Sequence, residues 1–373
     1  MRLVYLYTTL NWYRLEMFRS ISKMVDAHFY ILNGYSVGYE NIKFDQTYDD
    51  INLTILSKEE SEANNLIKKL NEEEFDAIVL PSMNSTYTLK LTTKLSHYFS
   101  KRKKCVMYFW EYWPMDFGRY GMEKVIKQGV RNFFTRLNKR SIDYFITPGI
   151  NTYTFYRNLG IPASKTIRCF NVSEVTDKDI RLNVRADLGI KDDEKMILYF
   201  GRIDDYKGVN ELTKVFKEMD RKNWHLVICG PGEEALKKKY EGVGNIHILG
   251  TVDTKDRCSY YSAADLFVLP NNYKKKIEAW GLTVNEAMSY GLPVIASDAT
   301  GSAEDLIFPG VNGYILDSKN LEKELKFYLD KVLTDDNLRT EMGEKSRKII
   351  SEYTFDNMAK AFVCAMEKHE RIK

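Results

Sequence analysis

The stretch "IEAWGLTVNEAMSYGLPVIAS", residues 277–297, contains two glutamates, Glu278 and Glu286, on either side of a turn that contains glycine. Thr283 suits the cap position of a short helix, and Gly291 suits the position after its last turn. Pro293 then ends the helix. The β-branched residues Val294 and Ile295 after it are typical of a buried strand. A loop, a helix and a strand in this order favour a βαβ unit.

Glu286 has a purely structural explanation, because Thr283-x-x-Glu286 matches a capping box in which the glutamate reaches back to an amide. This explanation leaves Glu278 and the Trp-Gly-Leu turn unaccounted for. The functional alternative is that a helix N-terminus presents free amides and the positive end of its dipole, which suit a phosphate. Glu278 and Glu286 would then meet hydroxyl groups on its two sides, as in a pyrophosphate that carries a sugar and a ribose.

A second stretch, "YFGRIDDYKGVNEL" at residues 199–212, places Arg202 and Lys207 around a tight loop between a strand and a helix. Two cations at the carboxyl end of a strand suit a phosphate whose negative charge grows as a bond breaks. The alternative is a surface turn whose charges are compensated by Asp204 and Asp205.

Short apolar runs alternate with helical patterns along most of the chain, which predicts βαβ units and parallel sheets. In the first half the expected strands are Arg2–Tyr7, Ala27–Leu32, Asn52–Leu56, Asp76–Leu80, Lys104–Trp110 and Ile142–Thr147. In the second half they are Lys195–Phe200, His225–Gly230, Ile246–Gly250, Leu266–Pro270 and Pro293–Ser297. Between the halves, the charged stretch Asn171–Asp193 is interpreted as a connection.

The expected fold class is therefore α/β, with two doubly wound Rossmann-like domains facing across a cleft. Ligands of such sheets bind at the carboxyl ends of the strands. We expect domains at residues 1–175 and 176–355, and a C-terminal helix at 356–373 that packs back on the first domain. A length of 373 residues also favours two domains over one.

Composition excludes several classes of protein. The net charge of +3 is too small to indicate nucleic-acid binding. The five scattered cysteines lack a C-x-x-C pattern, which favours a reduced, cytoplasmic chain over a disulfide framework or a zinc site. Because no apolar run approaches the roughly 20 residues of a spanning helix, any membrane contact should be peripheral.

The segment "GMEKVIKQGVRNFFTRLNKR", residues 121–140, is the candidate for such a contact. Its apolar residues share one helical face: Ile126, Val130, Phe133, Phe134 and Leu137. Basic residues lie elsewhere on the helix: Lys124, Lys127, Arg131, Arg136 and Lys139. Basic amphipathic helices can lie on anionic lipid. The alternative is that the apolar face packs on the sheet. The two interpretations are compatible if the basic residues alone face lipid.

Six pieces occur in order over residues 195–316: "GRIDDYKGV", "ICGPGEE", "ILGTV", "YYSAADLFVLP", "EAWGLTVNEAMSYGLPVIASDATGSAEDLI" and "PGVNGYIL". This ordered set resembles glycosyltransferase family 4, retaining nucleotide-sugar glycosyltransferases of the GT-B fold. The resemblance implies that residues 176–355 bind the donor and that residues 1–175 bind the acceptor.

The resemblance also implies roles for particular residues. Arg202 and Lys207 would bind the donor diphosphate, Glu278 would contact the donor sugar near the reacting carbon, and these three would be the catalytic residues. Glu286 would bind the ribose hydroxyls. The resemblance implies two further contacts, both with backbone groups. The distal phosphate would bind the start of the helix at Gly281, Leu282 and Thr283, and the base would lie near Val252.

No metal or other cofactor is expected. Asp177-Lys178-Asp179 is formally a D-x-D sequence, but no apolar strand precedes it, and we interpret it as solvated linker.

The first half resembles the family more loosely. Where the family often has a Gly-Gly loop, this chain has "TTLNWYR", which includes Thr9 and Asn11. Where the family often has a His-Asp-like pair, this chain has Trp110 and Glu111. These four residues are the candidates for the acceptor side. Glu111 could bind or polarise an acceptor hydroxyl, or it could form a cap or salt bridge; Trp110 could stack on a sugar or belong to the core.

We therefore expect a retaining glycosyltransferase of the hexosyl type that moves a sugar from a nucleotide diphosphate to an acceptor hydroxyl. The acceptor would be a glycan or a lipid-linked molecule in cell-surface polysaccharide or glycolipid synthesis, at the cytoplasmic face of the membrane. Two alternatives remain: a nucleotide-sugar epimerase or hydrolase on the same fold, and a non-catalytic partner subunit. The missing Gly-Gly and histidine favour the latter, and the intact cations and glutamates oppose it.

Overall fold

The computed structural model describes residues 1–8, 12–32, 48–111, 122–173, 179–272 and 278–372. The chain forms two compact units, one of Met1–Val172 with Thr354–Lys373 and the other of Ser173–Tyr353. The boundaries expected from the sequence are residues 175 and 355. Each unit contains its own parallel sheet with helices on both sides.

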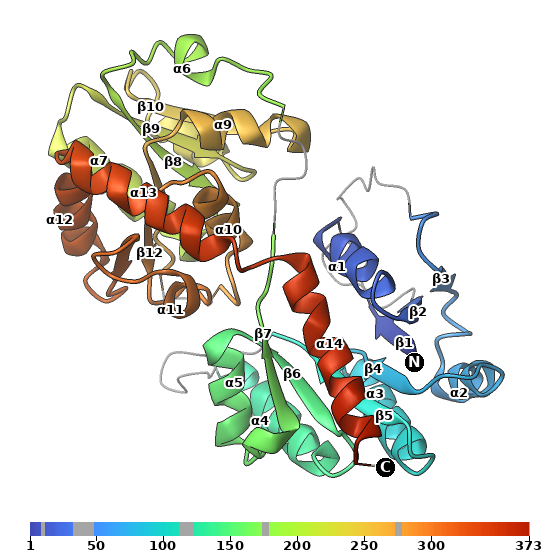
Figure 1. The fold of residues 1–373 in the computed structure, drawn as a ribbon. Coiled ribbons are helices and arrows are strands. Elements are labelled where there is room, and N and C mark those ends of the chain that lie inside the picture. Colours follow the sequence, from blue (N-terminus) through green and yellow to red (C-terminus); the bar gives the residue numbers. More distant parts are fainter. Residues whose placement is uncertain (9–11, 33–47, 112–121, 174–178, 273–277, 373) are drawn as a thin grey trace. The chain divides into compact units, whose positions relative to one another are not determined.

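The described part of the first unit has a sheet of seven parallel strands in the order β3-β2-β1-β4-β5-β6-β7 (Figure 1). The strands are β1 (Arg2–Tyr7), β2 (Asp26–Leu32), β3 (Leu53–Leu56), β4 (Ala77–Leu80), β5 (Cys105–Phe109), β6 (Tyr144–Pro148) and β7 (Thr166–Cys169). The helices are α1 (Trp12–Ser22), α2 (Ala63–Asn71), α3 (Thr86–Ser100), α4 (Met122–Asn138), α5 (Gly149–Asn158), the 3₁₀ helix η2 (Ala163–Lys165) and α14 (Phe355–Glu370).

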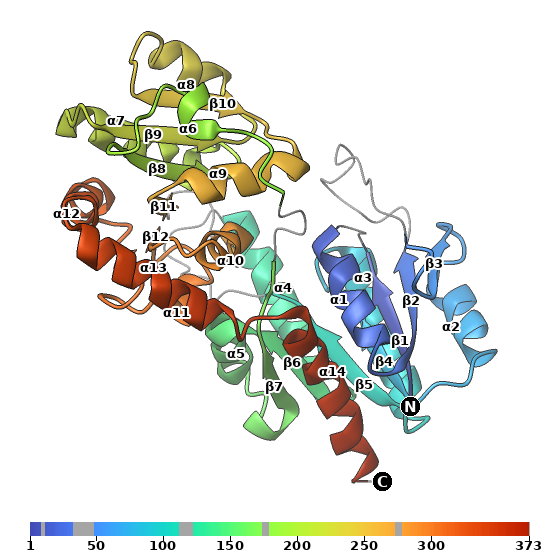
Figure 2. The ribbon, with the colours of Figure 1, turned by 45° about the horizontal axis from the view of Figure 1, so that its top comes forward.

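Two cores form on the two faces of this sheet, because alternate side chains of a strand point to opposite faces. In β1, Leu3 and Tyr5 belong to the core under α1 and α14, whereas Val4 and Leu6 belong to the core under α2, α3 and α5. Helix α14 comes from the far end of the chain and lies beside α1 (Figure 2). The C-terminal helix is therefore part of the first unit.

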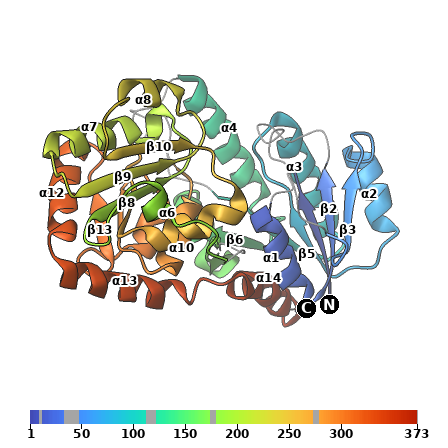
Figure 3. The same cartoon turned by 90° about the horizontal axis from the view of Figure 1, so that it is seen from above.

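The described part of the second unit has a sheet of six parallel strands in the order β10-β9-β8-β11-β12-β13. The strands are β8 (Lys195–Phe200), β9 (Trp224–Cys229), β10 (Ile246–Gly250), β11 (Leu266–Leu269), β12 (Val294–Ser297) and β13 (Gly313–Leu316). The helices are α6 (Val184–Asp187), η3 (Asp205–Lys207), α7 (Val209–Met219), α8 (Glu234–Lys239), η4 (Thr254–Asp256), α9 (Arg257–Ala263), α10 (Leu282–Ser289), α11 (Ala303–Leu306), α12 (Leu321–Leu333) and α13 (Asp336–Ile350). Helices α7 and α12 lie side by side (Figure 3).

Each strand predicted from the sequence is present, with bounds that differ by two residues at most. Two strands were not predicted, β7 and β13. Each has four residues and is the last strand of its sheet. Arg168 interrupts the apolar run of β7 and Gly313 begins β13, so neither segment has the continuous apolar pattern of a central strand.

The strand order reverses once in each sheet, between β1 and β4 and between β8 and β11. Connections leave such a point toward opposite faces, which opens a crevice at the carboxyl ends of the two strands. In the second unit, the segment that contains Arg202 and Lys207 follows β8, and the segment that leads to Glu278 follows β11. The fold thus brings the two quoted stretches to one edge of one sheet.

Helix α4 is oriented against expectation. From residue 125 onward, where its side chains are described, the buried ones are polar, namely Gln128, Thr135 and Asn138. Four of its apolar side chains are 45–61% exposed: Ile126, Val130, Phe133 and Leu137. The prediction that this apolar face packs on the sheet is therefore wrong for these four residues, and only Phe134 packs against the core.

In the parts of the chain that the structure describes, no helix combines the length and the hydropathy needed to cross a bilayer.

Gly208 allows the loop after β8 to approach the end of β11. Its φ is +67°, and a Cβ atom at this position would lie 1.8 Å from the carbonyl oxygen of Pro270. We expect Gly208→Ala to lower the free energy of unfolding by more than the roughly 1–2 kcal/mol that the left-handed conformation alone costs a non-glycine residue. Urea denaturation measures this loss.

Gly189 provides the matched control, because its φ is +69° and nothing lies within 4 Å of the corresponding Cβ position. Gly189→Ala should show the conformational cost alone. Equal losses in the two variants would contradict the close approach at Gly208.

Candidate functional site

The loop after β8 presents two cations in different environments. Arg202 is exposed, pairs with Asp204 at 3.3 Å and donates to the Tyr206 hydroxyl at 2.8 Å. Lys207, at the end of η3, is buried. Burial and the charge of Glu278 raise the pKa of Tyr206 to about 12, so its hydroxyl stays protonated at neutral pH. The sequence-based surface-turn interpretation therefore fits Arg202 but not Lys207.

Lys207 forms an ion pair with Glu278. The backbone of Glu278 is fixed beside the end of β12, since its amide donates to Ala299 and its carbonyl accepts from Gly301. An ammonium group has three donors, and Glu278 provides one acceptor, so Lys207 retains hydrogen-bonding capacity. This pair joins the loops that follow β8 and β11.

Helix α10 begins at Leu282, directly after this pair in the chain. Its cap residue is Gly281, with φ +89°, and no side chain caps its first amides. The first amides of an α-helix have no acceptor within the helix. The expected helix cap at Thr283 is therefore wrong by two residues, and the amides of Leu282 and Thr283 form the start of α10.

Glu286 is 1% exposed and is held by three donors from other segments. Its Oε1 accepts from the Ser173 hydroxyl at 2.7 Å. Its Oε2 accepts from the Tyr261 hydroxyl at 2.7 Å and from the Arg257 guanidinium. The capping-box interpretation is wrong, because these contacts lie away from the start of α10. A carboxylate has about four acceptor positions, so three donors leave about one for a ligand.

The partners of Glu286 were not predicted from the sequence. Burial and the charge of Glu286 raise the pKa of Tyr261 well above its usual value, which keeps this hydroxyl a donor. Arg257 also lies over the Phe200 ring, 4.7 Å from its centre. An arginine at the start of the short, otherwise uncharged helix "RCSYYSA" was the available signal.

Val252, the predicted neighbour of the base, is partly buried and packs against the core of the second unit. It lies in the loop after β10, at the carboxyl edge of the sheet that also carries the loops after β8 and β11. A contact between its backbone and a base stays a prediction.

The acceptor-side candidates belong to the first unit. Glu111 pairs with Arg14 at 2.7 Å, and its same oxygen, Oε1, accepts from Asn171 Nδ2 at 2.6 Å. Arg14 is buried and also donates to the Tyr7 hydroxyl at 3.0 Å. A salt bridge, one of the alternatives for Glu111, is thus present.

Trp110 is partly buried and packs against both cores of the first unit, so its core alternative holds for at least part of the ring. Thr9 and Asn11 lie outside the described residues.

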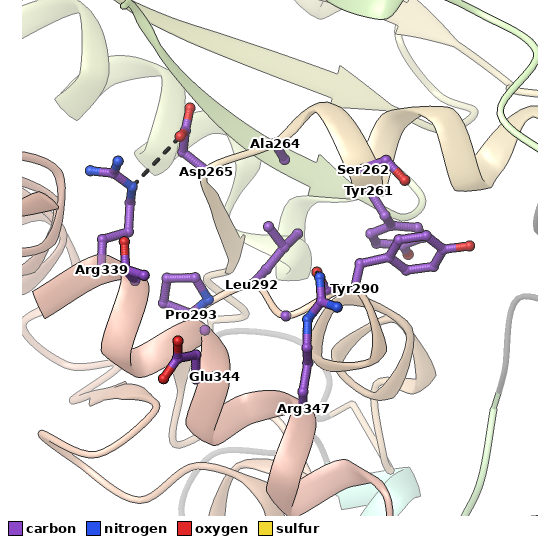
Figure 4. Close-up of a pocket in the computed structure, with 13 residues that line it drawn as sticks. Tyr261, Ser262, Ala264, Asp265, Tyr290, Leu292, Pro293, Arg339, Glu344 and Arg347 are labelled. Carbon is purple, nitrogen blue, oxygen red and sulfur yellow. Dashed lines mark hydrogen bonds and ion pairs between the residues drawn. The ribbon is translucent and has the colours of Figure 1, made fainter. Parts of the chain in front are cut away.

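A surface hollow of about 540 Å³ lies on the second unit, between α9, α13 and the segment that follows α10 (Figure 4). Arg339 pairs with Asp265 in it, and Arg347 donates to the carbonyl of Tyr290 at 2.8 Å. Its lining includes none of the predicted donor-binding residues. One lining residue, Tyr261, also donates to Glu286, so the hollow adjoins the candidate site through that side chain.

Residues 181–349 match the model of the family described as glycosyl transferases group 1. An uncharacterized glycosyltransferase of Methanocaldococcus jannaschii is 34% identical over 190 residues, which cover 49% of this chain and 47% of that protein. A lipopolysaccharide 1,2-N-acetylglucosaminetransferase of Salmonella typhimurium is 29% identical over 195 residues, 48% of this chain and 50% of that protein. The chain spans about half the length of these relatives.

The HepE protein of Anabaena, solved in complex with UDP, has a similar structure. Its TM-score is 0.76 at 15% identity, over 99% of this chain and 100% of that one. At this identity the likeness concerns the fold. Together with the two parallel sheets, it confirms the expected fold class of two Rossmann-like α/β domains of the GT-B type.

Breaking the buried pair around Glu286 should destabilise the second unit. We expect Arg257→Met to lower the free energy of unfolding by about 3–5 kcal/mol, because it leaves a buried carboxylate without its cation. The double variant Arg257→Met with Glu286→Gln should recover part of this loss, since the uncompensated charge is removed. Urea denaturation of the three proteins makes the comparison.

The matched control is Lys214→Met, which breaks an exposed ion pair with Glu322. Exposed pairs contribute little, so stability should hardly change. If Arg257→Met behaved like this control, the pair would not hold the second unit together.

Proposed function

We propose that this chain is a retaining glycosyltransferase of the hexosyl type, because residues 181–349 match the model of the glycosyl transferases group 1 family. It moves a sugar from a nucleoside diphosphate to the hydroxyl group of an acceptor. The observation that carries this proposal is the ion pair between buried Lys207 and partly exposed Glu278, at the point where the strand order of the second sheet reverses. The uncapped start of α10 follows the same pair in the chain.

The donor diphosphate lies, in this proposal, between the two cations and the start of α10. Lys207 is buried, so water and salt screen its charge less than that of exposed Arg202. The amides of Leu282 and Thr283 supply further donors, and the dipole of the helix favours negative charge there. Negative charge grows on the phosphate as the sugar leaves, and these groups stabilise it most in the transition state.

The two glutamates recognise the two ends of the donor. Glu278 keeps acceptor capacity beyond its bond to Lys207 and binds a hydroxyl of the transferred sugar. Glu286 uses its remaining acceptor position for a ribose hydroxyl, while Ser173, Tyr261 and Arg257 fix its orientation. The backbone near Val252 contacts the base.

The transfer forms a bond between the acceptor oxygen and the anomeric carbon and breaks the bond from that carbon to the phosphate. Both events take place on the same face of the sugar, which retains the configuration. The leaving phosphate oxygen takes the proton of the acceptor hydroxyl, so no separate base is required. No metal ion or other cofactor is part of this proposal.

The acceptor is a glycan or a lipid-linked molecule, and the reaction belongs to the synthesis of a cell-surface polysaccharide or glycolipid. The Salmonella relative, a lipopolysaccharide transferase by name, supports this class of acceptor. We assign the acceptor side to Glu111 and Trp110, with Thr9 and Asn11. Arg14 and Asn171 bind one oxygen of Glu111, which orients the other toward an acceptor hydroxyl. The protein acts at the cytoplasmic face of the membrane, with peripheral contact through residues 121–140.

Nucleoside diphosphates should stabilise the protein. A ligand at 100 times its dissociation constant adds about 2.7 kcal/mol to the free energy of unfolding, which raises the melting temperature. Thermal melting with UDP, GDP and ADP identifies the base by the largest increase. The absence of any increase with all three would contradict the proposed donor site.

Product analysis then identifies the reaction. With the matching nucleotide sugar and an acceptor, proton NMR should report a product with the anomeric configuration of the donor. Inversion would refute the retaining mechanism. Rapid consumption of donor in the absence of acceptor would favour an epimerase or hydrolase instead.

Lys207 should act mainly in the transition state. We expect Lys207→Ala to lower kcat by about ten- to a hundredfold, since a hydrogen bond to a charged group contributes about 1.5–3 kcal/mol and 1.36 kcal/mol is tenfold. Steady-state kinetics at saturating donor measure the change.

Lys214→Ala removes a comparable but exposed lysine from the neighbouring helix α7 and should leave kcat unchanged. A folded Lys207→Ala protein with the kcat of this control would remove Lys207 from the proposed role.

A further inference from the structure

Helix α4 has its apolar side outward and its polar side inward. With 100° per residue, Ile126, Val130, Phe133 and Leu137 form one stripe along the helix. Gln128, Thr135 and Asn138 lie on the opposite side and are buried. A surface helix of a soluble protein normally shows the reverse arrangement.

Hydrogen bonds fix this orientation of the helix. Asn138 is fully buried and donates to the Thr93 hydroxyl of α3 at 3.0 Å. Ser96, also in α3, donates to Asn138 Oδ1 at 3.4 Å. Rotating α4 to bury its stripe would break these bonds and leave buried polar groups without partners. The outward stripe is therefore a stable feature of the fold.

The stripe is also unusual for this molecule. Among the described residues, α4 carries four large apolar side chains that are at least 45% exposed, whereas each other helix carries one at most. Single exposed apolar residues need no explanation, but a continuous stripe indicates an interaction surface.

The charges beside the stripe identify the kind of partner. Residues 125–140 contain five cations and no acidic residue: Lys127, Arg131, Arg136, Lys139 and Arg140. Lys127 and Arg136 are exposed and lie about 90° from the stripe on its two flanks, as helical geometry requires. Long basic side chains in such positions reach the headgroups of a bilayer while the apolar side chains enter it.

We propose that α4 lies in the surface of an anionic bilayer, with Ile126, Val130, Phe133 and Leu137 inserted among the lipids. Lys127 and Arg136 bind the anionic headgroups from the two flanks. The helix lies parallel to the membrane plane, because its opposite side is bonded to α3. This inference rests on the proposed function, for which it specifies the membrane contact. Its test does not require sugar transfer.

Vesicle co-sedimentation of the full chain tests the proposal. One set of vesicles contains phosphatidylglycerol and phosphatidylcholine in equal parts, and the other contains phosphatidylcholine alone. We expect binding to the anionic vesicles that is about tenfold or more tighter than to the neutral ones and that weakens with added salt. Equal binding to both, or no binding to either, would overturn the proposal.

Two variants separate the apolar and the electrostatic contributions. Ile126→Ser with Phe133→Ser should weaken binding to anionic vesicles by about tenfold or more, because both side chains insert. Lys127→Glu with Arg136→Glu should abolish the preference for anionic lipid. All four side chains are exposed or at the surface, so the variants should melt like the original protein.

The matched control is Phe327→Ser in α12, because Phe327 is 60% exposed and Phe133 is 61% exposed. It should bind vesicles as the original protein does. The proposal would fail if the α4 variants bound anionic vesicles as well as the original protein does. It would also fail if the substitutions changed only the oligomeric state in gel filtration, because the stripe would then serve a protein contact. Stabilisation by nucleotide in the same variants reports the donor site separately.

Discussion

The ion pair between Lys207 and Glu278 is the contact on which the candidate site of the second unit depends. It joins the loops that follow β8 and β11, the two strands between which the strand order reverses. Because Lys207 is buried, separating the pair would leave a charge in a poorly solvated place, so the two loops hold each other in position. The start of α10 follows Glu278 closely in the chain. The same pair therefore sets the position of the cations relative to the amides of that helix.

Much of the fold could be predicted from the sequence, because central parallel strands are continuous apolar runs between helical patterns. The strands β7 and β13 could not, since each is a short strand at a sheet edge and lacks such a run. The residues of the site were visible as well, but their partners were not. Lys207 pairs with a residue 71 positions away, and Glu286 is bound by Ser173 and Arg257 from distant loops and helices. Local spacing suggests the nearest charged residue as the partner of each side chain. In this fold Lys207 and Glu286 pair instead with residues that are distant in the sequence.

Helix α4 illustrates a different limit. Its periodicity identifies an apolar face, and the usual rule turns that face inward. The deciding residue is Asn138, which looks like an ordinary surface polar residue in the sequence but is buried. Only the contact with α3 reveals its role, since Thr93 and Ser96 offer the matching hydroxyls. A pattern of hydrophobicity thus identifies the two sides of a helix, and the polar partners on a neighbouring helix determine which side is covered.

The return of the chain to its first unit has a consequence for biosynthesis. Phe355, Met358 and Phe362 of α14 complete one of the two cores of that unit, and these residues are translated after the whole second unit. Residues 173–353, in contrast, form a contiguous segment with a complete sheet and core of their own. Domains commonly fold as they leave the ribosome, beginning with the N-terminal one. In this protein the second unit can therefore complete its core first, and the first unit keeps an uncovered apolar face until α14 emerges.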